Sequence, residues 1–370
     1  MTQPLLVLSR RLRETPFEKR VFEQGAQAFT IYNHTPLSAV YRSPEEDYSH
    51  LCEHVQLWDV SCERQVEVAG PDALQLVELI TPRDISTSAI GQCKYAPLTD
   101  EHGGIVNDPI ILRLAEDRFW ISIADSDVLL WVKGLAAGRA MDVQVFEPDV
   151  SPLAVQGPKA DDLMAEIVGE HVRDIRFFWF IETEIASTPV ILARSGWSGQ
   201  GGFEIYLQDS GKGLDLWDAI WQVGEKYQIR AGCPNLIERL ETGLLSYGSD
   251  MTLANNPFEC GLDRFCDFGK PAEYLARQAL KEIKRDGVAR KIVRLRVDGR
   301  RVPAPRGIWS VVSDTGDSVG MVTSLAWSPR FDATLCLAIV DIGSTGPGTN
   351  LTIEAGDDRV TATVATPNWK

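Results

Sequence analysis

The chain has 370 residues, of which 44% are hydrophobic and 24% are charged, so it can form two or three globular domains. Its formal net charge of −15 argues against nucleic acid or an anionic membrane surface as a partner, because both need clustered cations. The seven cysteines form no C-x-x-C pair, which favours reduced thiols in a cytoplasmic protein over disulfides or structural zinc. An acidic protein does not repel a cationic or zwitterionic small molecule, and we expect a small-molecule substrate.

The first predicted elements are a short apolar run and a charged helix. Residues 5–8 are apolar but too few for a signal peptide, and positive charge follows them. A helix is predicted from Pro44 to His54, and His50-Leu-Cys-Glu-His54 within it matches the zinc-protease pattern H-x-x-E-H. A charged amphipathic helix produces this spacing by chance, so we favour a helix without a metal. No apolar run in the chain reaches transmembrane length.

A weak internal repeat relates residues 68–80 (VAGPDALQLVELI) to residues 155–167 (VQGPKADDLMAEI). Each copy predicts the end of a strand, a Gly-Pro turn and a helix with proline in its first turn. Between the copies, the sequence predicts strands at 93–97, 105–114 and 118–124 and a helix at 126–137. Helices are also predicted at 214–227 and 234–245. The first 280 residues are therefore predicted to be mixed α+β, with two related halves.

Two polar clusters interrupt these elements. Asn107 and Asp108 break an apolar run in the return strand of a hairpin, and by themselves they indicate a strand irregularity before Pro109. Three charged residues lie close together on the helix at 234–245, where an ion-paired surface is the ordinary interpretation; they are Glu238, Arg239 and Glu241.

The segment Arg194–Tyr206 (RSGWSGQGGFEIY) places a tryptophan, a carboxylate and a tyrosine around a glycine-rich turn. Its flanks predict strand–turn–strand, with Glu204 and Tyr206 on one face of the second strand. A carboxylate beside an aromatic ring can accept paired N–H bonds from an amino-heterocycle; a plain surface hairpin is the alternative. The glycine spacing fits neither a dinucleotide-binding loop nor a hydrolase nucleophile elbow.

From about Arg290 the chain changes to short β segments separated by Gly, Asp and Pro turns, which predicts a small β-barrel. The segments are 291–297, 309–312, 336–340, 350–354 and 360–364. The polar segment 279–289 is the predicted linker, although it begins as a helix.

Several motifs together carry a family resemblance. In order and spacing they resemble the glycine-cleavage T-protein (aminomethyltransferase) superfamily over nearly the whole chain; they are Gly104–Asp108, Val155–Pro158, Arg194–Ile205, Arg239–Gly243 and Pro257–Asp263. Further motifs, including Cys62–Gln65 and Leu244–Gly248, resemble the dimethylsulfoniopropionate demethylase branch of that superfamily.

The resemblance implies an α+β, three-domain cloverleaf fold that binds tetrahydrofolate in a central channel. The implied folate-binding halves are residues 1–60 with 150–230 and residues 61–149 with 231–285, and the C-terminal β-barrel is 290–370. By analogy, Glu204 holds the pterin's amino and ring N–H groups. The other implied cofactor contacts are Tyr95, Arg194 and Tyr206.

The resemblance also assigns the donor pocket and the chemistry. Trp197, Tyr206, Tyr32 and Phe178 are the candidates for binding the substrate. Asp108 and Asn107 are the candidates for catalysis, and no metal is expected. T-proteins typically carry two adjacent aspartates where this chain has Asn-Asp, which disfavours ammonia release and formation of methylene-folate.

The implied reaction is methyl transfer from dimethylsulfoniopropionate to tetrahydrofolate, giving 3-methylmercaptopropionate and 5-methyltetrahydrofolate. The demethylase branch often has Lys where this chain has Gly199, and a second aromatic where it has Lys94, so another onium or methylated amine stays open as the donor. A folate-binding protein without turnover is the alternative from another class. The donor carboxylate could meet backbone amides, Tyr32 or Lys94, and a homodimer is also left open.

Overall fold

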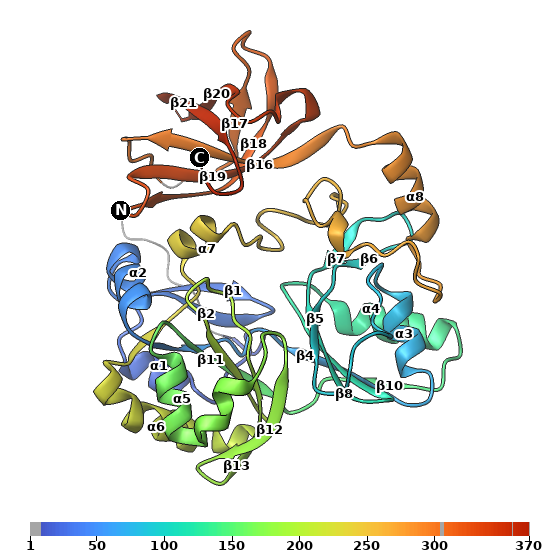
Figure 1. Ribbon diagram of the computed structural model, residues 1–370, viewed down its shortest axis with the longest axis vertical. Helices are drawn as coiled ribbons and strands as arrows, with labels where there is room; N and C mark the ends of the chain where they lie inside the picture. Colours follow the sequence, from blue (N-terminus) through green and yellow to red (C-terminus); the bar gives the residue numbers. More distant parts are fainter. Residues whose placement is uncertain (1–8, 304–306, 357, 370) are drawn as a thin grey trace. The chain divides into compact units, whose positions relative to one another are not determined.

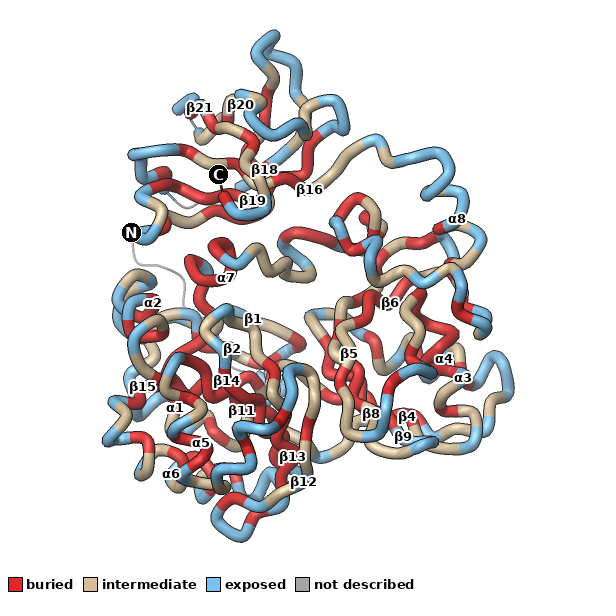
Figure 2. The backbone as a smooth tube through the Cα atoms, viewed as in Figure 1, coloured by how far each residue is buried: buried red, intermediate tan, exposed pale blue. Residues whose placement is uncertain are grey.

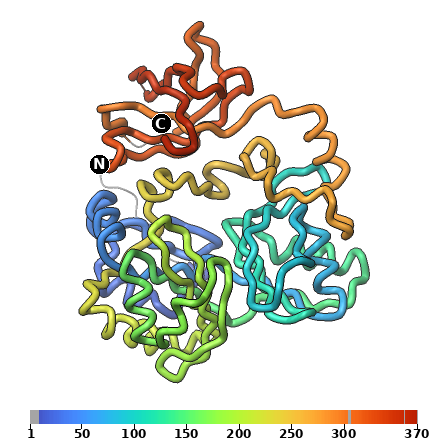
Figure 3. Tube along the Cα trace, viewed as in Figure 1, coloured from blue at the N-terminus to red at the C-terminus, as the bar shows by residue number. Residues whose placement is uncertain are grey.

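The computed structural model describes residues 9–303, 307–356 and 358–369; residues 5–8 of the apolar run lie outside them. The described chain forms two compact units, each assembled from segments far apart in the sequence (Figures 1 and 3). Unit 1 contains the chain up to residue 65 with 147–196 and 200–234. Unit 2 contains 66–146, 197–199 and the chain from 235 onward.

Unit 1 is built on a six-stranded sheet. In spatial order the strands are β12 (Phe180–Ile185), β13 (Thr188–Ala193), β14 (Gly202–Leu207), β11 (Ser151–Gln156), β3 (Gln56–Asp59) and β15 (Arg230–Gly232). All neighbours are antiparallel except β15 and β3. One face packs against α5 (Ala160–Val168) and α6 (Gly213–Gly224) in a core that includes Phe203, Ile205 and Trp217. The remaining elements are α1 (Glu18–Glu23), the hairpin of β1 (Ala28–Tyr32) and β2 (Thr35–Val40), and α2 (Pro44–Glu53).

Unit 2 begins with a five-stranded sheet covered by two helices. The strand order is β10 (Gln144–Phe146), β4 (Gln65–Ala69), β9 (Arg118–Ser122), β8 (Ile110–Ala115) and β5 (Cys93–Tyr95). Apolar residues of α3 (Ala73–Leu79) and α4 (Val128–Gly138) pack on it. The small pair β6 (Leu98–Thr99) and β7 (Ile105–Asn107) lies apart from this sheet, because the predicted strand 105–114 breaks at Asp108 and Pro109.

The predicted repeat corresponds to β4–α3 and β11–α5. Gly70 and Gly157 have φ of 131° and 128°. A Cβ atom would lie 2.7 Å from a backbone oxygen at Gly70 and 2.3 Å from one at Gly157, so only glycine permits this close approach. Both helices begin two residues after the proline, so the prolines precede the first turn instead of forming part of it.

The C-terminal part of unit 2 contains α7 (Leu236–Thr242), α8 (Arg277–Asp286) and a closed barrel. Its strands are β16 (Arg290–Asp298), β17 (Trp309–Val312), β18 (Ser318–Ser328), β19 (Ala333–Asp341), β20 (Asn350–Ala355) and β21 (Asp358–Ala365). The predicted α+β class and C-terminal β-barrel are confirmed. Single 3₁₀ turns occur at 170–174, 210–212, 225–227, 263–265 and 342–344.

Two predictions for this region were incomplete. The sequence did not reveal β18, because an irregular register between Val322 and Ser324 breaks its alternation. The segment predicted as a linker is mostly α8, since Leu280 is buried with Tyr274 and Ala276. None of the helices in the described residues is both long and apolar enough to span a membrane.

The ordinary interpretation of α7 as an ion-paired helix surface does not describe these three charges. Glu238, Arg239 and Glu241 are all buried, and Figure 2 shows the middle of α7 as buried. Arg239 Nη1 pairs with Asp250 Oδ2 at 2.5 Å, and Glu241 accepts from Ser328 Oγ. The three charges therefore have tertiary partners that helical spacing alone does not predict.

Candidate functional site

In unit 1, a buried carboxylate lies on the face of β14 opposite the apolar core. Glu204 pairs in register with Ala154 and alternates with the core residues Phe203 and Ile205. Its Oε2 accepts hydrogen bonds from the Ser195 hydroxyl and from Tyr206 OH, the latter at 3.2 Å. Burial raises the pKa of Glu204. The predicted facing of Glu204 and Tyr206 agrees with this arrangement, whereas the sequence did not single out Ser195.

The glycine-rich turn is shaped by a buried amide beneath it. Gln156 is fully buried, and its Nε2 donates to the backbone oxygens of Ser195 and Phe203 at 3.3 and 3.4 Å. A Cβ atom at Gly196 would lie 2.1 Å from the Gln156 side chain, and one at Gly202 would lie 2.7 Å away. The Val155–Pro158 motif therefore holds Ser195 in place beside Glu204.

In unit 2, Tyr95 and Asp108 form a second polar pair. Tyr95 OH donates to Asp108 Oδ2 at 3.0 Å, and the break between β7 and β8 turns the carboxylate out of the strand ladder. Burial raises the pKa of Asp108 to about 7, although the Tyr95 hydrogen bond opposes that shift. Burial, together with the Asp108 charge, raises the pKa of Tyr95. A carboxyl group that titrates near neutrality can accept or release a proton.

Asn107 holds the backbone next to Asp108. Its side chain is completely buried and donates to Ala124 O at 3.0 Å and to Ser126 Oγ at 2.8 Å. Its Oδ1 accepts from Ala124 N at 2.9 Å. These bonds use the amide in fixing the strand break, which makes Asn107 a residue that positions Asp108.

Trp197 belongs to unit 2, together with Ser198 and Gly199. Gly199 N donates to Glu238 Oε1 at 2.6 Å, which ties the turn to α7. The Arg239 Cζ atom lies 5.7 Å from the centre of a Trp197 ring. A Cβ atom at Gly199 would lie 2.3 Å from Thr242 Cγ2, so the lysine common at this position in the demethylase branch requires Thr242 to move.

The other predicted residues of unit 1 have contacts of their own. Arg194 forms an ion pair with Asp161 on α5, at 2.7 Å, and its guanidinium lies over Phe203, which belongs to the opposite, core face of the sheet. Phe178 donates its backbone N–H to Arg194 O and packs against Phe177. Tyr32 ends β1, opposite Thr35.

Lys94 in unit 2 binds a neighbouring loop. Its Nζ donates to Asp84 O at 2.8 Å and to Thr87 Oγ1 at 2.6 Å, and burial lowers its pKa. These contacts give Lys94 a role in holding the loop at 84–87, which weakens its candidacy as the carboxylate ligand.

The H-x-x-E-H pattern lies on α2, but each imidazole has a different partner. His50 Nε2 lies 2.8 Å from Gln228 O, and burial lowers the pKa of His50 to about 4. His54 Nδ1 lies 2.8 Å from Lys159 Nζ. Within the described residues, no group of three His, Cys, Asp or Glu side chains is placed to hold a metal ion.

Family comparisons agree with this architecture. The GCVT N-terminal domain matches residues 17–270, and the glycine cleavage T-protein C-terminal barrel domain matches residues 290–369. The chain therefore belongs to the glycine cleavage T-protein family, and the predicted resemblance is confirmed.

Three individual relatives show which members of the family this chain resembles. The chain is 48% identical to a protein of Ruegeria pomeroyi named dimethylsulfoniopropionate demethylase DmdA, over 98% of both chains. It is 30% identical to an aminomethyltransferase of Bacillus cytotoxicus, over 90% of this chain and 92% of the other. The crystal structure of the glycine cleavage system aminomethyltransferase T from Bartonella henselae superposes with a TM-score of 0.87 at 25% identity, covering 97% of this chain and 98% of that one.

Proposed function

We propose that this protein is a tetrahydrofolate-dependent methyltransferase that demethylates dimethylsulfoniopropionate to 3-methylmercaptopropionate, with 5-methyltetrahydrofolate as the second product. The observation that carries the proposal is the 48% identity to the Ruegeria pomeroyi demethylase over 98% of both chains. The Asn107–Asp108 pair supports it, because the buried amide replaces the first of the two aspartates typical of T-proteins.

The proposed folate contacts fit the chemistry of the residues present. Glu204 is a buried carboxylate that already accepts hydrogen bonds from two hydroxyl groups, so it suits the amino and ring N–H donors of a pterin. Tyr206 supplies an aromatic wall and a hydroxyl on the same face. When bound, tetrahydrofolate supplies the nucleophilic N5 that receives the methyl group.

The protein contributes position and a site for a proton. A sulfonium methyl needs little acid assistance, because its departure leaves a neutral thioether. Alignment of the two reactants can lower the barrier by about 7–11 kcal/mol at most. In our proposal Asp108, whose pKa is raised to about 7, accepts the proton that N5 loses after methyl transfer. Tyr95 and Asn107 hold the Asp108 carboxyl group in place.

The proposal extends to the organisation and setting of the protein. Residues 1–60 with 150–230 and residues 61–149 with 231–285 form the two folate-binding domains, and 290–370 form the barrel domain. All seven cysteines are free thiols, which fits a cytoplasmic enzyme. A homodimer is the assembly to be tested by light scattering.

Anaerobic incubation of the purified protein with tetrahydrofolate and dimethylsulfoniopropionate tests the reaction. We expect 3-methylmercaptopropionate and 5-methyltetrahydrofolate in equal amounts by mass spectrometry. A parallel panel of other sulfonium compounds and methylated amines, scored for 5-methyl against 5,10-methylene folate, identifies a different donor. Folate binding without any methylated product across that panel would instead support the non-catalytic alternative.

A Trp197→Ala variant tests the donor pocket. An aromatic face stabilises a cation by about 0.5–2 kcal/mol, so we expect the KM for the sulfonium donor to rise roughly 2- to 30-fold. Trp197→Phe keeps an aromatic ring and serves as the matched control, with the smaller rise. An unchanged KM and unchanged donor affinity in the alanine variant would remove Trp197 from the pocket.

A further inference from the structure

Two arginine side chains flank Phe265 in unit 2. The Cζ atoms of Arg83 and Arg264 lie 4.8 and 4.7 Å from the centre of the Phe265 ring. In the part of the chain that the structure describes, neither guanidinium makes a hydrogen bond or an ion pair with the protein. The chain has 52 acidic and 37 basic residues, so two neighbouring cations without a carboxylate are unexpected.

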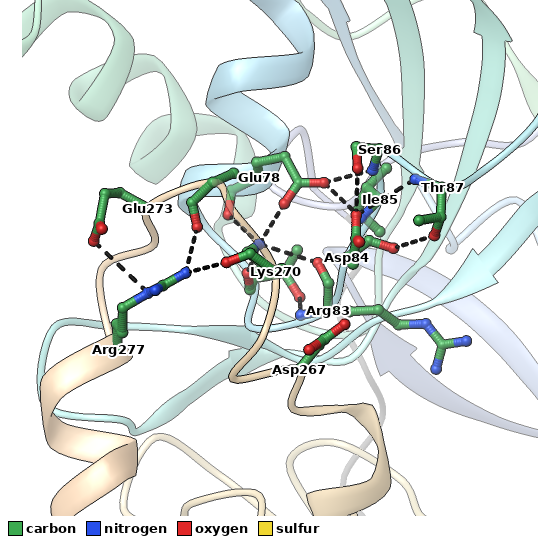
Figure 4. Close-up of polar contacts among 12 residues, drawn as sticks. Glu78, Arg83, Asp84, Ile85, Ser86, Thr87, Asp267, Lys270, Glu273 and Arg277 are labelled. Carbon is green, nitrogen blue, oxygen red and sulfur yellow. Dashed lines mark hydrogen bonds and ion pairs between the residues drawn. The ribbon is translucent and has the colours of Figure 1, made fainter.

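A buried ion pair fixes the backbone that presents Arg83. Lys270 and Glu78 are almost completely buried and form an ion pair, with Nζ and Oε2 2.5 Å apart. Lys270 Nζ also donates to the carbonyl oxygens of Thr81 and Arg83 at 2.8 and 3.1 Å. Glu78 Oε1 accepts from Ile85 N at 2.6 Å. Figure 4 shows this clamp, with the Arg83 side chain pointing away from it.

Two carboxylates close to Arg83 and Arg264 in sequence, Asp84 and Asp267, are engaged with their own loops. Asp84 Oδ1 accepts from Ser86 Oγ at 2.6 Å, and Asp267 Oδ1 accepts from Gly269 N at 2.8 Å. Burial and the neighbouring Arg264 charge both lower the pKa of the half-buried Arg83. An anion placed against the two guanidiniums would relieve their mutual repulsion.

The arginine pair is connected to the proposed proton acceptor through two aromatic rings in edge-on contact. The Phe265 ring packs edge-on against Tyr95, with centroids 4.9 Å apart. Tyr95 OH in turn donates to Asp108. The Phe265 ring therefore separates the two cations from Tyr95, the side chain that binds Asp108.

We propose that Arg83 and Arg264 form a carboxylate-binding site for the ligands of the reaction, and this inference rests on the proposed function. The planar guanidinium offers paired N–H donors that match a carboxylate. Two sources have this chemistry: the propionate group of dimethylsulfoniopropionate and the glutamate group of tetrahydrofolate. Lys94, the charged side chain that the sequence suggested for the donor carboxylate, is held by the 84–87 loop. Among the described residues the guanidiniums of Arg83 and Arg264 contact Phe265 but make no hydrogen bond or ion pair.

Calorimetric titration of the full-length protein tests the site without requiring turnover. The probes are dimethylsulfoniopropionate, trimethylsulfonium (which lacks the carboxylate), tetrahydrofolate and its triglutamate. Arg83→Gln and Arg264→Gln are compared with Arg139→Gln, the same change at an exposed arginine beyond the end of α4. Loss of a charge-assisted hydrogen bond predicts binding that is about 10- to 100-fold weaker for the carboxylate-bearing ligand.

The four probes distinguish the donor's propionate group from the glutamate group of the folate. If the site binds the donor, Arg83→Gln weakens dimethylsulfoniopropionate binding and leaves trimethylsulfonium and both folates unchanged. If it binds the glutamate group, only the folates weaken, and either result supports the site. Arg83→Lys keeps the positive charge but loses the paired N–H donors of the guanidinium. Its affinity for the carboxylate-bearing ligand should lie between those of the wild type and Arg83→Gln.

Unchanged binding of all four probes in folded Arg83→Gln and Arg264→Gln proteins would overturn the inference. Arg264 is exposed, and its guanidinium makes no hydrogen bond or ion pair among the described residues, so its variant should keep nearly the wild-type melting temperature. If arginine-dependent binding is found but no methyl group is transferred, the carboxylate site stands and the proposed reaction fails.

Discussion

Replacing Asp108 with Asn is expected to lower kcat for methyl transfer by about 100-fold or more, the usual contribution of a positioned general base. Burial raises the pKa of Asp108 to about 7, so the wild-type rate should climb with pH and level off above that value. The asparagine variant should lose this limb of the pH profile. Initial rates measured from pH 5.5 to 8.5 check both statements.

Two comparisons make the Asp108 test specific. Asp117→Asn makes the same change at an exposed turn between β8 and β9 and should leave the profile unaltered. Tyr95→Phe removes the hydrogen bond that lowers the pKa of Asp108. The rise in rate of this variant should therefore occur at a higher pH than in the wild type. A wild-type pH profile in Asp108→Asn would exclude Asp108 as the proton acceptor.

Asp108→Asn should also change stability with a defined sign. Because the folded pKa of Asp108 is above its ordinary value of 3.8, the folded protein binds the proton more tightly than the unfolded chain. As the pH rises from about 4 to 7, the free energy of unfolding of the wild type therefore falls, by at most about 4 kcal/mol. The variant should melt at a higher temperature than wild type above pH 7, and this advantage should vanish near pH 4.

Replacing Glu204 with Gln is expected to weaken tetrahydrofolate binding by about 2–3 kcal/mol, roughly 30- to 150-fold. The amide keeps one acceptor oxygen but loses the charge that strengthens a pair of N–H bonds. Burial raises the pKa of Glu204, which means that ionisation of this carboxyl costs stability, so the neutral amide should not unfold the protein. Equilibrium titration under anaerobic conditions gives the affinity, and a melting curve confirms the fold.

The matched control for this prediction is Glu182→Gln on β12, the edge strand of the same sheet, which β13 separates from β14. It should bind tetrahydrofolate as the wild type does. Donor affinity should also be preserved in Glu204→Gln, because the proposed contact is with the pterin. Wild-type folate affinity in Glu204→Gln would show that the carboxylate does not anchor the cofactor.

The class of fold and the family motifs could be predicted from the amino-acid sequence. Local signals were sufficient for β13 and β14 with the turn between them, for the two Gly-Pro repeats, and for the change to β structure after Arg290. Alternation along β14 also placed Glu204 and Tyr206 on one face, since strand periodicity is a local property.

The partners of the polar side chains became visible once the chain was folded. Helical spacing on α7 suggested pairs within the helix, yet Arg239 binds Asp250 and Glu241 binds Ser328, which are distant in sequence. No motif in the sequence pointed to Arg83. Its position is set by the Glu78–Lys270 pair, which binds its backbone, and by Phe265, which contacts its guanidinium. Pattern and propensity act over a few residues, whereas a buried charge takes its partner from whichever segment the packed core brings within hydrogen-bonding distance.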